Sequence, residues 1–384
     1  MTFDIKQDIR IQFFDPSVGE WTNMQCDSFE VNIDRGIDVE QNTFARPKVG
    51  TATVRMMKKS LYDLMNPTGP VYKSNDFFRI QAQITPGAWI SIFTGLIQNF
   101  EIGYNVAAKK AEITLVANDY IKIALNTNIT SFSITGTATR SYINVMNQLA
   151  TAINVIDSRF SLLRGTGTAG SSTFQRTDTY LNVPSGELFT QFLDAELGWM
   201  YSDLNNQPRF VTRGDITALQ GTAFGTGIRV SNIHSSSTNH ICMDRLEITY
   251  KSDEIANQVR VENIFTGVKT TSTNATSVTN FGRQLADFAV DFDPAVSGGT
   301  TYAQWAAEVA SAATPRRISG VSVPMISDLG EIQDIVTKDI GDNLNIEFRT
   351  PGFSDLQEVS IISNLNHVID ANHWELNIGL WKGV

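Results

Sequence analysis

The stretch Asn345-Ile346-Glu347-Phe348-Arg349-Thr350-Pro351-Gly352 has a counterpart in Arg79-Ile80-Gln81-Ala82-Gln83-Ile84-Thr85-Pro86-Gly87. A constant offset in residue number (350 − 85 = 265) superposes the two Thr-Pro-Gly turns, and it also places Ile97 on Ile362 and Asn99 on Asn364. In the next segment a slip of two positions brings Glu112 onto Glu375. Each Thr-Pro-Gly is a turn between strands, because Pro fixes φ and Gly adopts positive φ. The repeat predicts two β-meanders related by internal duplication; the alternative is a chance match between ordinary meanders.

The composition favours β-structure with many polar loops. The chain has 384 residues, of which 42% are hydrophobic and only 18% charged, which suits two or three domains with a sizeable core. The net charge of −10 argues against binding to nucleic-acid phosphates, although an acidic chain can line a passage to which nucleic acid must not stick.

Cysteine usage and hydropathy indicate where the protein is made. Cys26 and Cys242 are far apart in no spacing motif, which suggests a reducing compartment without disulfides. The N-terminus lacks a basic region followed by an apolar run, so we expect no cleaved signal peptide. No apolar run approaches the roughly 20 residues that a membrane span needs.

Residues 1–125 form the first predicted domain. Short alternating segments with turns between them predict seven antiparallel strands in a barrel or sandwich. Arg35-Gly36-Ile37-Asp38 interrupts the alternation of the second segment, and residues 60–74 are predicted as a loop. The predicted strands cover residues 8–14, 29–33, 49–57, 77–84, 88–97, 99–104 and 111–117.

Residues 126–240 form a predicted α+β insert. One helix follows Thr139 and a second begins at Pro184-Ser185, with Gly198 as its C-terminal stop. A turn at residues 205–208 leads into a strand at residues 209–213. The apolar positions of the two helices recur at helical spacing: Tyr142, Val145, Met146, Leu149 and Ile153 in the first, and Leu188, Phe189, Phe192, Leu193 and Leu197 in the second.

Residues 241–384 form a second predicted β-domain with a helical insertion around residues 280–315. Strands are expected around Leu246 and around Val259, and the sheet resumes at Ile318. The inserted helix is predicted from five apolar residues at helical spacing, and Pro315 ends it: Tyr302, Trp305, Ala306, Val309 and Ala313. The predicted fold class is therefore mainly β with α+β inserts.

A few local patterns resemble functional sites. Gly165-Thr166-Gly167-Thr168-Ala169-Gly170 matches the dinucleotide-binding spacing, but a polar segment follows it where a helix is needed, which favours a flexible loop. His234, His240 and Cys242 lack a fourth metal ligand at usual spacing. His367 and His373 flank a turn between strands and are expected at the surface.

No pattern indicates an enzyme. Asp194 and Glu196 lie two apart on one helix and so face different ways, and no pair among the 40 acidic residues is singled out. The Asn128 and Asn274 sequons have no meaning without a secretory signal. We therefore predict no catalytic, cofactor-binding or metal-binding residues and no cofactor.

Segments at both ends of the chain resemble a known family. They look like the hub proteins at the tip of bacteriophage tails, including the myophage baseplate hub, and are similar in plan to the hub part of type VI secretion spike proteins. The resemblance is one of pattern and order over most of the chain. The segments are Arg35-Gly36, Gly50-Thr51-Ala52-Thr53-Val54, Ile92-Phe93-Thr94-Gly95-Leu96-Ile97, Ile255-Ala256-Asn257-Gln258-Val259-Arg260-Val261, Ile340-Gly341-Asp342-Asn343-Leu344, Asn366-His367-Val368-Ile369 and Trp374-Glu375-Leu376.

The resemblance implies a structural role without catalytic residues. Two tube-type antiparallel β-barrel domains in one chain would make a homotrimer a pseudo-six-fold ring, which adapts the hexameric tail tube to a trimeric tip. The implied partners are further copies of the chain, the tube or distal tail ring, a tip, spike or fibre protein, and genome DNA passing without specific binding. The implied location is the virion, after assembly in the host cytoplasm.

Two other functions stay open on the sequence alone. One is a distal tail or other minor tail protein, in which one tube domain per chain serves six-fold symmetry. The other is a carbohydrate-binding or carbohydrate-hydrolysing β-protein that acts at a cell surface.

Overall fold

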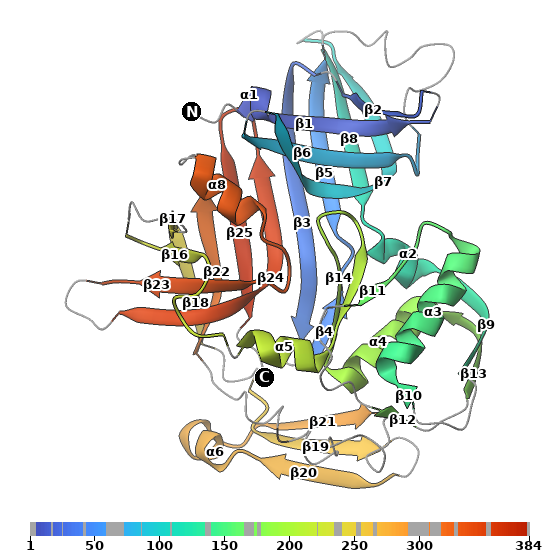
Figure 1. Ribbon diagram of the computed structural model, residues 1–384, viewed down its shortest axis with the longest axis vertical. Coiled ribbons are helices and arrows are strands. Elements are labelled where there is room, and N and C mark those ends of the chain that lie inside the picture. Colours follow the sequence, from blue (N-terminus) through green and yellow to red (C-terminus); the bar gives the residue numbers. More distant parts are fainter. Residues whose placement is uncertain are drawn as a thin grey trace.

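The computed structural model describes residues 5–381 apart from 17, 25, 41–43, 59–72, 86, 108–109, 135–139, 165–172, 175–177, 221, 234–239, 251–254, 264–266, 291–306, 308–315, 326–328 and 351–354. The described part is mainly β, which confirms the coarse fold class (Figure 1). In the described part of the chain no helix is long and apolar enough to cross a membrane.

The first third of the chain forms strands that belong to one large sheet. These elements are α1 (Ile5–Asp8), β1 (Ile9–Asp15), β2 (Glu20–Asn23), β3 (Ser28–Glu40), β4 (Phe44–Pro47), β5 (Thr51–Lys58), β6 (Phe77–Thr85), β7 (Ala88–Asn105) and β8 (Lys110–Asn118). Strand β8 illustrates why they form, because its buried residues alternate with half-exposed ones: Ala111, Ile113, Leu115 and Ala117.

The middle of the chain, where an α+β insert is predicted, contains helices and short strands, and we keep the name insert for it. Its elements are α2 (Ile121–Asn126), β9 (Asn128–Ile134), β10 (Arg140–Ser141), α3 (Tyr142–Ile156), β11 (Leu163–Arg164), β12 (Thr173–Phe174), β13 (Asp178–Pro184), α4 (Ser185–Glu196), β14 (Trp199–Ser202), β15 (Pro208–Val211) and α5 (Arg213–Gln220). Two short strands, β16 (Arg229–Ser231) and β17 (His240–Cys242), then return to the large sheet.

Both helices of the insert form where their apolar spacing predicts. Val145, Met146, Leu149 and Ile153 of α3 are fully buried and share a core with α4. The end of α4 differs from the prediction, because Leu197 and not Gly198 takes the left-handed conformation. Gly198 is needed for space, since a Cβ there would lie 2.8 Å from the Val211 carbonyl oxygen.

The last third of the chain returns to the large sheet after a small sheet of its own. Its elements are β18 (Arg245–Tyr250), β19 (Gln258–Asn263), β20 (Lys269–Thr273), α6 (Ala275–Phe281), β21 (Leu285–Val290), β22 (Arg316–Pro324), α8 (Leu329–Val336), β23 (Asn343–Phe348), β24 (Leu356–Ile369) and β25 (Trp374–Trp381). Of the predicted helix between Tyr302 and Ala313, only Ala307 is among the described residues, and it is helical.

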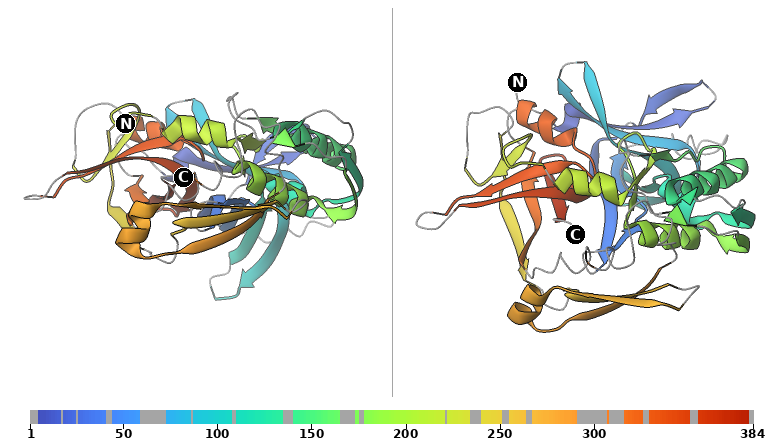
Figure 2. Two further views of the ribbon diagram at one scale, coloured as in Figure 1. Left: turned by 90° about the horizontal axis from the view of Figure 1, so that it is seen from below. Right: turned by 60° about the horizontal axis from the view of Figure 1, so that its bottom comes forward.

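The strand around Val259 does not join the large sheet. It is β19, which pairs with β20 and β21 in a separate three-stranded sheet below the rest of the molecule (Figures 1 and 2). Val259 and Val261 share a buried cluster with α3 and α4. The segment therefore packs with the insert, and the three domain boundaries stay predictions.

Eight strands of the large sheet form an unbroken hydrogen-bonded run across the molecule, in the order β18-β22-β25-β24-β3-β5-β8-β7 (Figure 1). The run begins in the C-terminal third and ends in the N-terminal third. Among the described strands no sheet closes on itself. The two predicted barrels therefore stay a prediction.

The long strands β7 and β24 share an irregularity at the same position. A β-bulge interrupts the pairing of β7 with β8 between Ile97 and Asn99, and another interrupts the pairing of β24 with β25 between Ile362 and Asn364. The offset of the Thr-Pro-Gly repeat also relates these two bulges (362 − 97 and 364 − 99 both equal 350 − 85). The sequence predicted two strands separated at Gln98, whereas the structure has one strand with the bulge there.

Each bulge lies where a long strand exchanges partners. The first half of β7 pairs with β6 and its second half with β8. Likewise, the first half of β24 pairs with β23 and its second half with β25. A bulge increases local twist, which suits a strand that passes from one hairpin to the next.

The turns before these hairpins also match. Asn75 has φ 71° and its N–H donates to the Ile97 carbonyl; Gly341 has φ 88° and its N–H donates to the Ile362 carbonyl. An aspartate follows each of them, and its carbonyl accepts from the same isoleucine. The two meanders thus share strand order, bulge position and the preceding turn.

Strand β3 corrects one expectation. Arg35-Gly36-Ile37-Asp38 does not end the strand, which continues to Glu40. Its first part pairs with β5 and its last part with β4. The loss of alternation therefore marks a change of partner within one strand.

Candidate functional site

The two meanders meet where β3 pairs with β24. The antiparallel pairing runs from Gly36 opposite Asn364 to Val31 opposite Ile369. We call these two segments the internal seam. A Cβ on Gly36 would lie 2.7 Å from the Ser363 carbonyl oxygen, so only glycine lets the backbones approach beside the bulge.

Polar side chains add to the pairing along the internal seam. The Asn364 amide donates to the Asp34 carboxylate at 2.9 Å, and the Asn366 amide donates to Asn32 Oδ1 at 3.1 Å. The carboxylate of Asp34 also lies 2.7 Å from the ammonium group of Lys48. These contacts tie the first meander to the second beyond the backbone ladder.

Arg35 extends from the seam into a buried junction. Its side chain is 2% exposed, and Nη2 donates both to the Ser202 carbonyl at 2.6 Å and to Asp339 Oδ1 at 2.9 Å. The second oxygen of Asp339 accepts from the Leu204 backbone N–H at 3.0 Å. One guanidinium and one carboxylate thus join β3, the insert and the loop before β23. We call this set of contacts the clasp.

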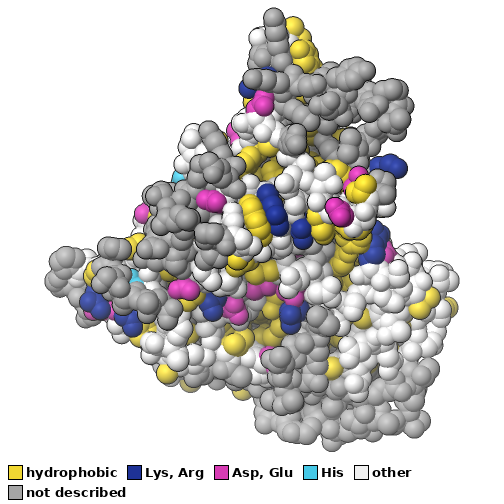
Figure 3. Space-filling model, turned by 45° about the horizontal axis from the view of Figure 1, so that its top comes forward, with side chains coloured by type: hydrophobic (Ala, Val, Ile, Leu, Met, Phe, Trp, Pro, Cys, Tyr) yellow, Lys and Arg dark blue, Asp and Glu magenta, His cyan; other side chains and the backbone are white. Residues whose placement is uncertain are grey.

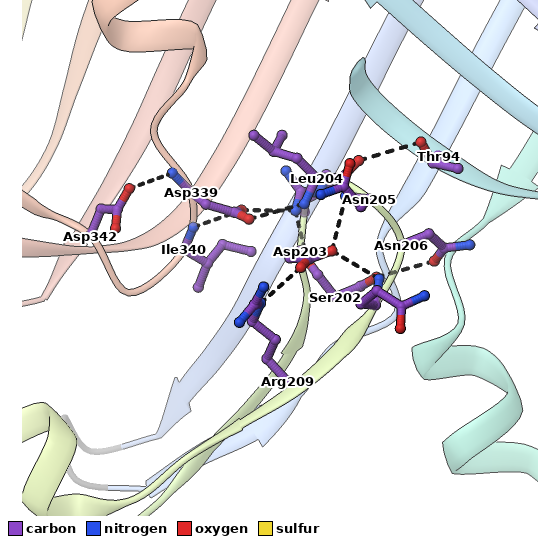
Figure 4. A network of polar contacts seen from close by, with 12 residues as sticks. Thr94, Ser202, Asp203, Leu204, Asn205, Asn206, Arg209, Asp339, Ile340 and Asp342 are labelled. Atoms are coloured by element: carbon purple, nitrogen blue, oxygen red, sulfur yellow. Dashed lines mark hydrogen bonds and ion pairs between the residues drawn. The ribbon is translucent and has the colours of Figure 1, made fainter. Parts of the chain in front are cut away.

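The insert reaches the clasp with the turn between β14 and β15. Asp203 orders that turn, because Oδ1 accepts from the backbone N–H groups of Asn205 and Gln207 and Oδ2 accepts from Arg209 Nε at 2.8 Å. The close view shows the turn between the Asp339 loop and Thr94 (Figure 4). This local order holds Leu204 against Asp339.

The same turn also contacts the first meander. Thr94 Oγ1 on β7 donates to the Leu204 carbonyl at 3.3 Å, and the Tyr120 N–H donates to Asn206 Oδ1 at 2.8 Å. Asn206 has φ 62°, a left-handed conformation that asparagine tolerates. One turn therefore binds both meanders.

Two buried titratable groups lie near Arg35. Burial raises the pKa of Asp119 to about 7, although the Arg35 charge acts in the opposite direction. Burial, together with Arg35, lowers the pKa of His367 to about 3. His367 is therefore neutral near pH 7, and its Nδ1 accepts from Trp374 Nε1 at 3.2 Å.

The junction is suited to fixing the geometry of two sheets. A desolvated arginine with a carboxylate and a carbonyl sets a unique register, and removal of one partner leaves the other uncompensated. Within the described residues, no group of three or more His, Cys, Asp or Glu side chains is placed to hold a metal ion.

Comparisons with known proteins identify the fold. No protein-family model matches the chain, and no curated protein matches it by sequence. Two solved structures match over nearly the full length of both chains. The 43 kDa tail protein of prophage MuSo2 from Shewanella oneidensis has a TM-score of 0.59 at 12% identity, over 97% of this chain and 98% of that chain. The tail protein from Neisseria meningitidis MC58 has a TM-score of 0.60 at 8% identity, over 98% of each chain.

The chain has the fold of a phage tail protein. This fold includes both meanders, the insert and the small sheet, because the matches cover nearly the whole chain. A further match is described as the E. coli c3393 protein, a component of the type VI secretion system. Its TM-score is 0.49 at 7% identity, over 93% of this chain and 73% of that chain.

Within this tail-protein fold the histidines lie differently from expectation. His367 was expected at the surface, yet it lies in β24 and is buried, because the strand extends through the predicted turn region. His373 is exposed, as expected, and it also contacts Glu375. His240 is buried on β17, whereas His234 and the glycine-rich loop at residues 165–170 fall outside the described residues.

The acidic residues on α4 also have structural surroundings. Asp194 forms an ion pair with Arg46 of β4, and Glu196 is fully buried. Asn274 caps α6 by accepting from the Ser277 N–H. Sequence reasoning missed Arg35, Asp203 and Asp339; the only available signal was the break in alternation at Arg35-Gly36.

Charges are mixed on the face of the tail-protein fold drawn in Figure 3. In its described part, basic and acidic side chains lie scattered among hydrophobic ones and gather in no patch of one sign. Continuous tracking of a phosphate backbone requires a basic groove or stripe. This face lacks such a stripe in its described part.

Proposed function

We propose that this chain is a structural virion protein, the hub at the tip or baseplate of a phage tail. In the proposed assembly three copies form a ring of six β-meander units. The ring adapts a six-fold tail tube to a three-fold tip and lines the channel through which the genome leaves.

The shared bulge carries this proposal. The two meanders share the same strand order and the same preceding turn, and their bulges lie at the matching positions Ile97 and Ile362. These shared features support an internal duplication. Duplicated tube-type units at residues 1–125 and 241–384, with the insert at residues 126–240 between them, give one chain the two similar surfaces that a pseudo-six-fold trimer needs. The fold supports the same assignment.

The partners follow from this role. They are further copies of the chain, the ring at the end of the tube, and a tip, spike or fibre protein. We propose that the chain has no enzymatic activity and that it is assembled in the host cytoplasm into the virion. A net charge of −10 suits a channel from which DNA must slide without specific binding.

Solution mass, checked by negative-stain class averages, tests the proposal. We expect a trimer, three times the 42.4 kDa of one chain, that appears as a pseudo-six-fold ring. A stable hexameric ring would overturn the hub assignment in favour of a distal or minor tail protein. A monomer that binds a glycan panel or clears cell walls would instead support a carbohydrate-active surface protein.

A further inference from the structure

Hydrophobic side chains alternate along the second half of β7 as buried side chains do along β24, but in β7 they are more exposed. The offset that relates the two bulges places residues 99–104 of β7 on residues 364–369 of β24. In β24 the alternate side chains are 2%, 3% and 1% exposed (Leu365, His367, Ile369). In β7 the corresponding Ile102 is 38% and Tyr104 48% exposed. A face that is buried in one meander is thus open in the other.

The difference follows from the neighbour of each strand. β24 has β25 on one side and β3 on the other, along the internal seam. Residues 101–104 of β7 pair with β8 on one side, and no described strand pairs with them on the opposite side. That side of β7 is therefore an edge of the described sheet, which can template the pairing of another strand.

Strand β18 is the counterpart of β3. Val31 of β3 pairs with Val54, which pairs with Leu115 of β8. Leu246 of β18 pairs with Val321, which pairs with Ile378 of β25. Leu115 and Ile378 are related by the same offset that relates Glu112 to Glu375 (378 − 115 equals 375 − 112).

Strand β18 also has an open edge. Its described pairing is with β22 alone. A β-bulge interrupts the pairing of β18 with β22 between Glu247 and Ile248, and its extra residue, Ser319, lies on β22, so the count along β18 is unchanged. Ile248 follows Leu246 by two residues, as Ile33 follows Val31, and it is 42% exposed, whereas Ile33 is fully buried. The chain thus has an open β24-like edge at one end of its run of strands and an open β3-like edge at the other.

We propose that β7 of one copy of this chain pairs antiparallel with β18 of the next copy, in the register of the internal seam. The proposal rests on the proposed function and specifies how its copies join. In the internal seam, paired residue numbers sum to 400 (369 + 31). Transferred to the two edges, the sum is 350 (104 + 246). The pairs are Tyr104–Leu246, Gly103–Glu247, Ile102–Ile248 and Glu101–Thr249.

The side chains fit this register. It sets Ile102 opposite Ile248. Both are partly exposed β-branched residues, which pack well across a strand pair. Glu247 faces Gly103 and Glu101 faces Thr249, so no like charges oppose each other. A register shifted by two (101 + 247 = 348) would set Glu101 opposite Glu247 and repel.

The pairing joins copies and not the ends of one chain. β18 and β7 are the first and last strands of the eight-strand run and lie on opposite sides of the molecule (Figure 1). Because the two edges differ, the contact is head-to-tail, and a head-to-tail contact closes into a ring when its rotation divides a full turn.

Disulfide trapping tests the register. In a chain with Cys26→Ser and Cys242→Ser, one variant carries Ile102→Cys with Ile248→Cys and another Gly103→Cys with Glu247→Cys. Adjacent positions alternate between narrow and wide strand pairs, so one of these two pairs has the spacing that a disulfide needs. The controls are each single-cysteine chain and the shifted pair Tyr104→Cys with Ile248→Cys, whose diagonal separation is about 7–8 Å.

We expect an in-register pair to give covalent dimers and trimers on a non-reducing gel at least ten-fold faster than the shifted pair. The solution mass of the cysteine-free chain is measured in parallel. A trimer in which the shifted pair reacts faster, or neither in-register pair reacts, overturns the proposed pairing and leaves the hub assignment intact. If neither the cysteine-free chain nor the unmodified chain forms a trimer, both the proposed pairing and the hub assignment are overturned.

Discussion

Asp119 is the residue whose protonation should affect stability most visibly. Its pKa is raised to about 7 by burial, from an ordinary value near 4. Between these values the folded protein holds a proton that the unfolded chain has released. The free energy of unfolding therefore decreases as pH rises through this range.

Asp119→Asn should remove this dependence. The Asp119 Oδ1 atom accepts from the Ile121 N–H at 3.1 Å, and an amide oxygen can do the same. We expect the stability of the variant relative to the parent to increase by at least about 1 kcal/mol between pH 4.5 and pH 7.5. Urea unfolding at both pH values measures it, and an unchanged difference would contradict the pKa assignment.

The contribution of His367 to stability has the opposite pH dependence. It is the same in the parent and in Asp119→Asn, so it cancels in the difference between them. Its pKa is lowered to about 3, so its contribution is present above its unfolded pKa and is lost as pH falls toward 3. The sequence did not predict the burial of this histidine. A lone His near a polar segment does not reveal that Trp374 packs on it or that Arg35 lies nearby.

At the scale of elements, the internal seam depends on how closely β3 approaches the bulge in β24. Gly36→Ala places a Cβ 2.7 Å from a backbone oxygen that cannot move without disturbing the bulge. We expect a loss of about 1–3 kcal/mol in the free energy of unfolding, measured by urea titration.

Gly87→Ala is the matched control. Gly87 has φ 86° as the Thr-Pro-Gly repeat predicted, but no atom lies within 4 Å of the position that a Cβ would take, so only backbone strain opposes the change. We expect a cost of about 1 kcal/mol. If Gly36→Ala cost less than Gly87→Ala, crowding at the seam would be refuted. Gly352, the second predicted turn glycine, falls outside the described residues.

Strands and helices were largely predictable because their periodicity is local. The apolar spacing predicted α3 and α4 and most strands of the first meander. Partner changes were not predictable. Arg35-Gly36 was interpreted as an interruption and Gln98 as a gap, since a strand that changes neighbours loses its alternation without ending.

At the scale of the whole molecule, assembly should depend on the open edge of β7. A lysine on an edge strand discourages pairing with another strand, because its charge would have to be desolvated. Ile102→Lys should therefore convert the expected trimer to monomer. Because Ile102 is 38% exposed, we expect the fold of each chain to be little affected and the melting temperature to change by only about a few degrees relative to the unmodified chain. Sedimentation velocity and circular dichroism measure the two effects.

Val155→Lys is the control for the added charge. Val155 lies on α3 of the insert and is 83% exposed, so we expect the trimer to persist. Addition of Ile248→Glu to Ile102→Lys should restore the trimer by placing opposite charges across the proposed pair. Persistence of the trimer in Ile102→Lys alone would refute the role of this edge.

The architecture beyond the repeat was less accessible from sequence. The match of two meanders was visible because turn residues and polar bulge residues are distinctive. The clasp was not, because Arg35, Ser202 and Asp339 are far apart along the chain and join only when the insert folds back between the meanders. The path of β19 into a separate sheet was equally hidden, since its alternation resembles that of its neighbours.

The clasp makes the joints of the proposed ring unequal. Inside each copy, a buried arginine and an ordered turn lock neighbouring units together. Between copies, Tyr250 occupies the position that corresponds to Arg35, so the guanidinium is missing there. A ring that looks six-fold would then have three stiff contacts, one within each copy, and three weaker contacts between copies. Force from a contracting or docking tail would therefore separate the ring at the three contacts between copies.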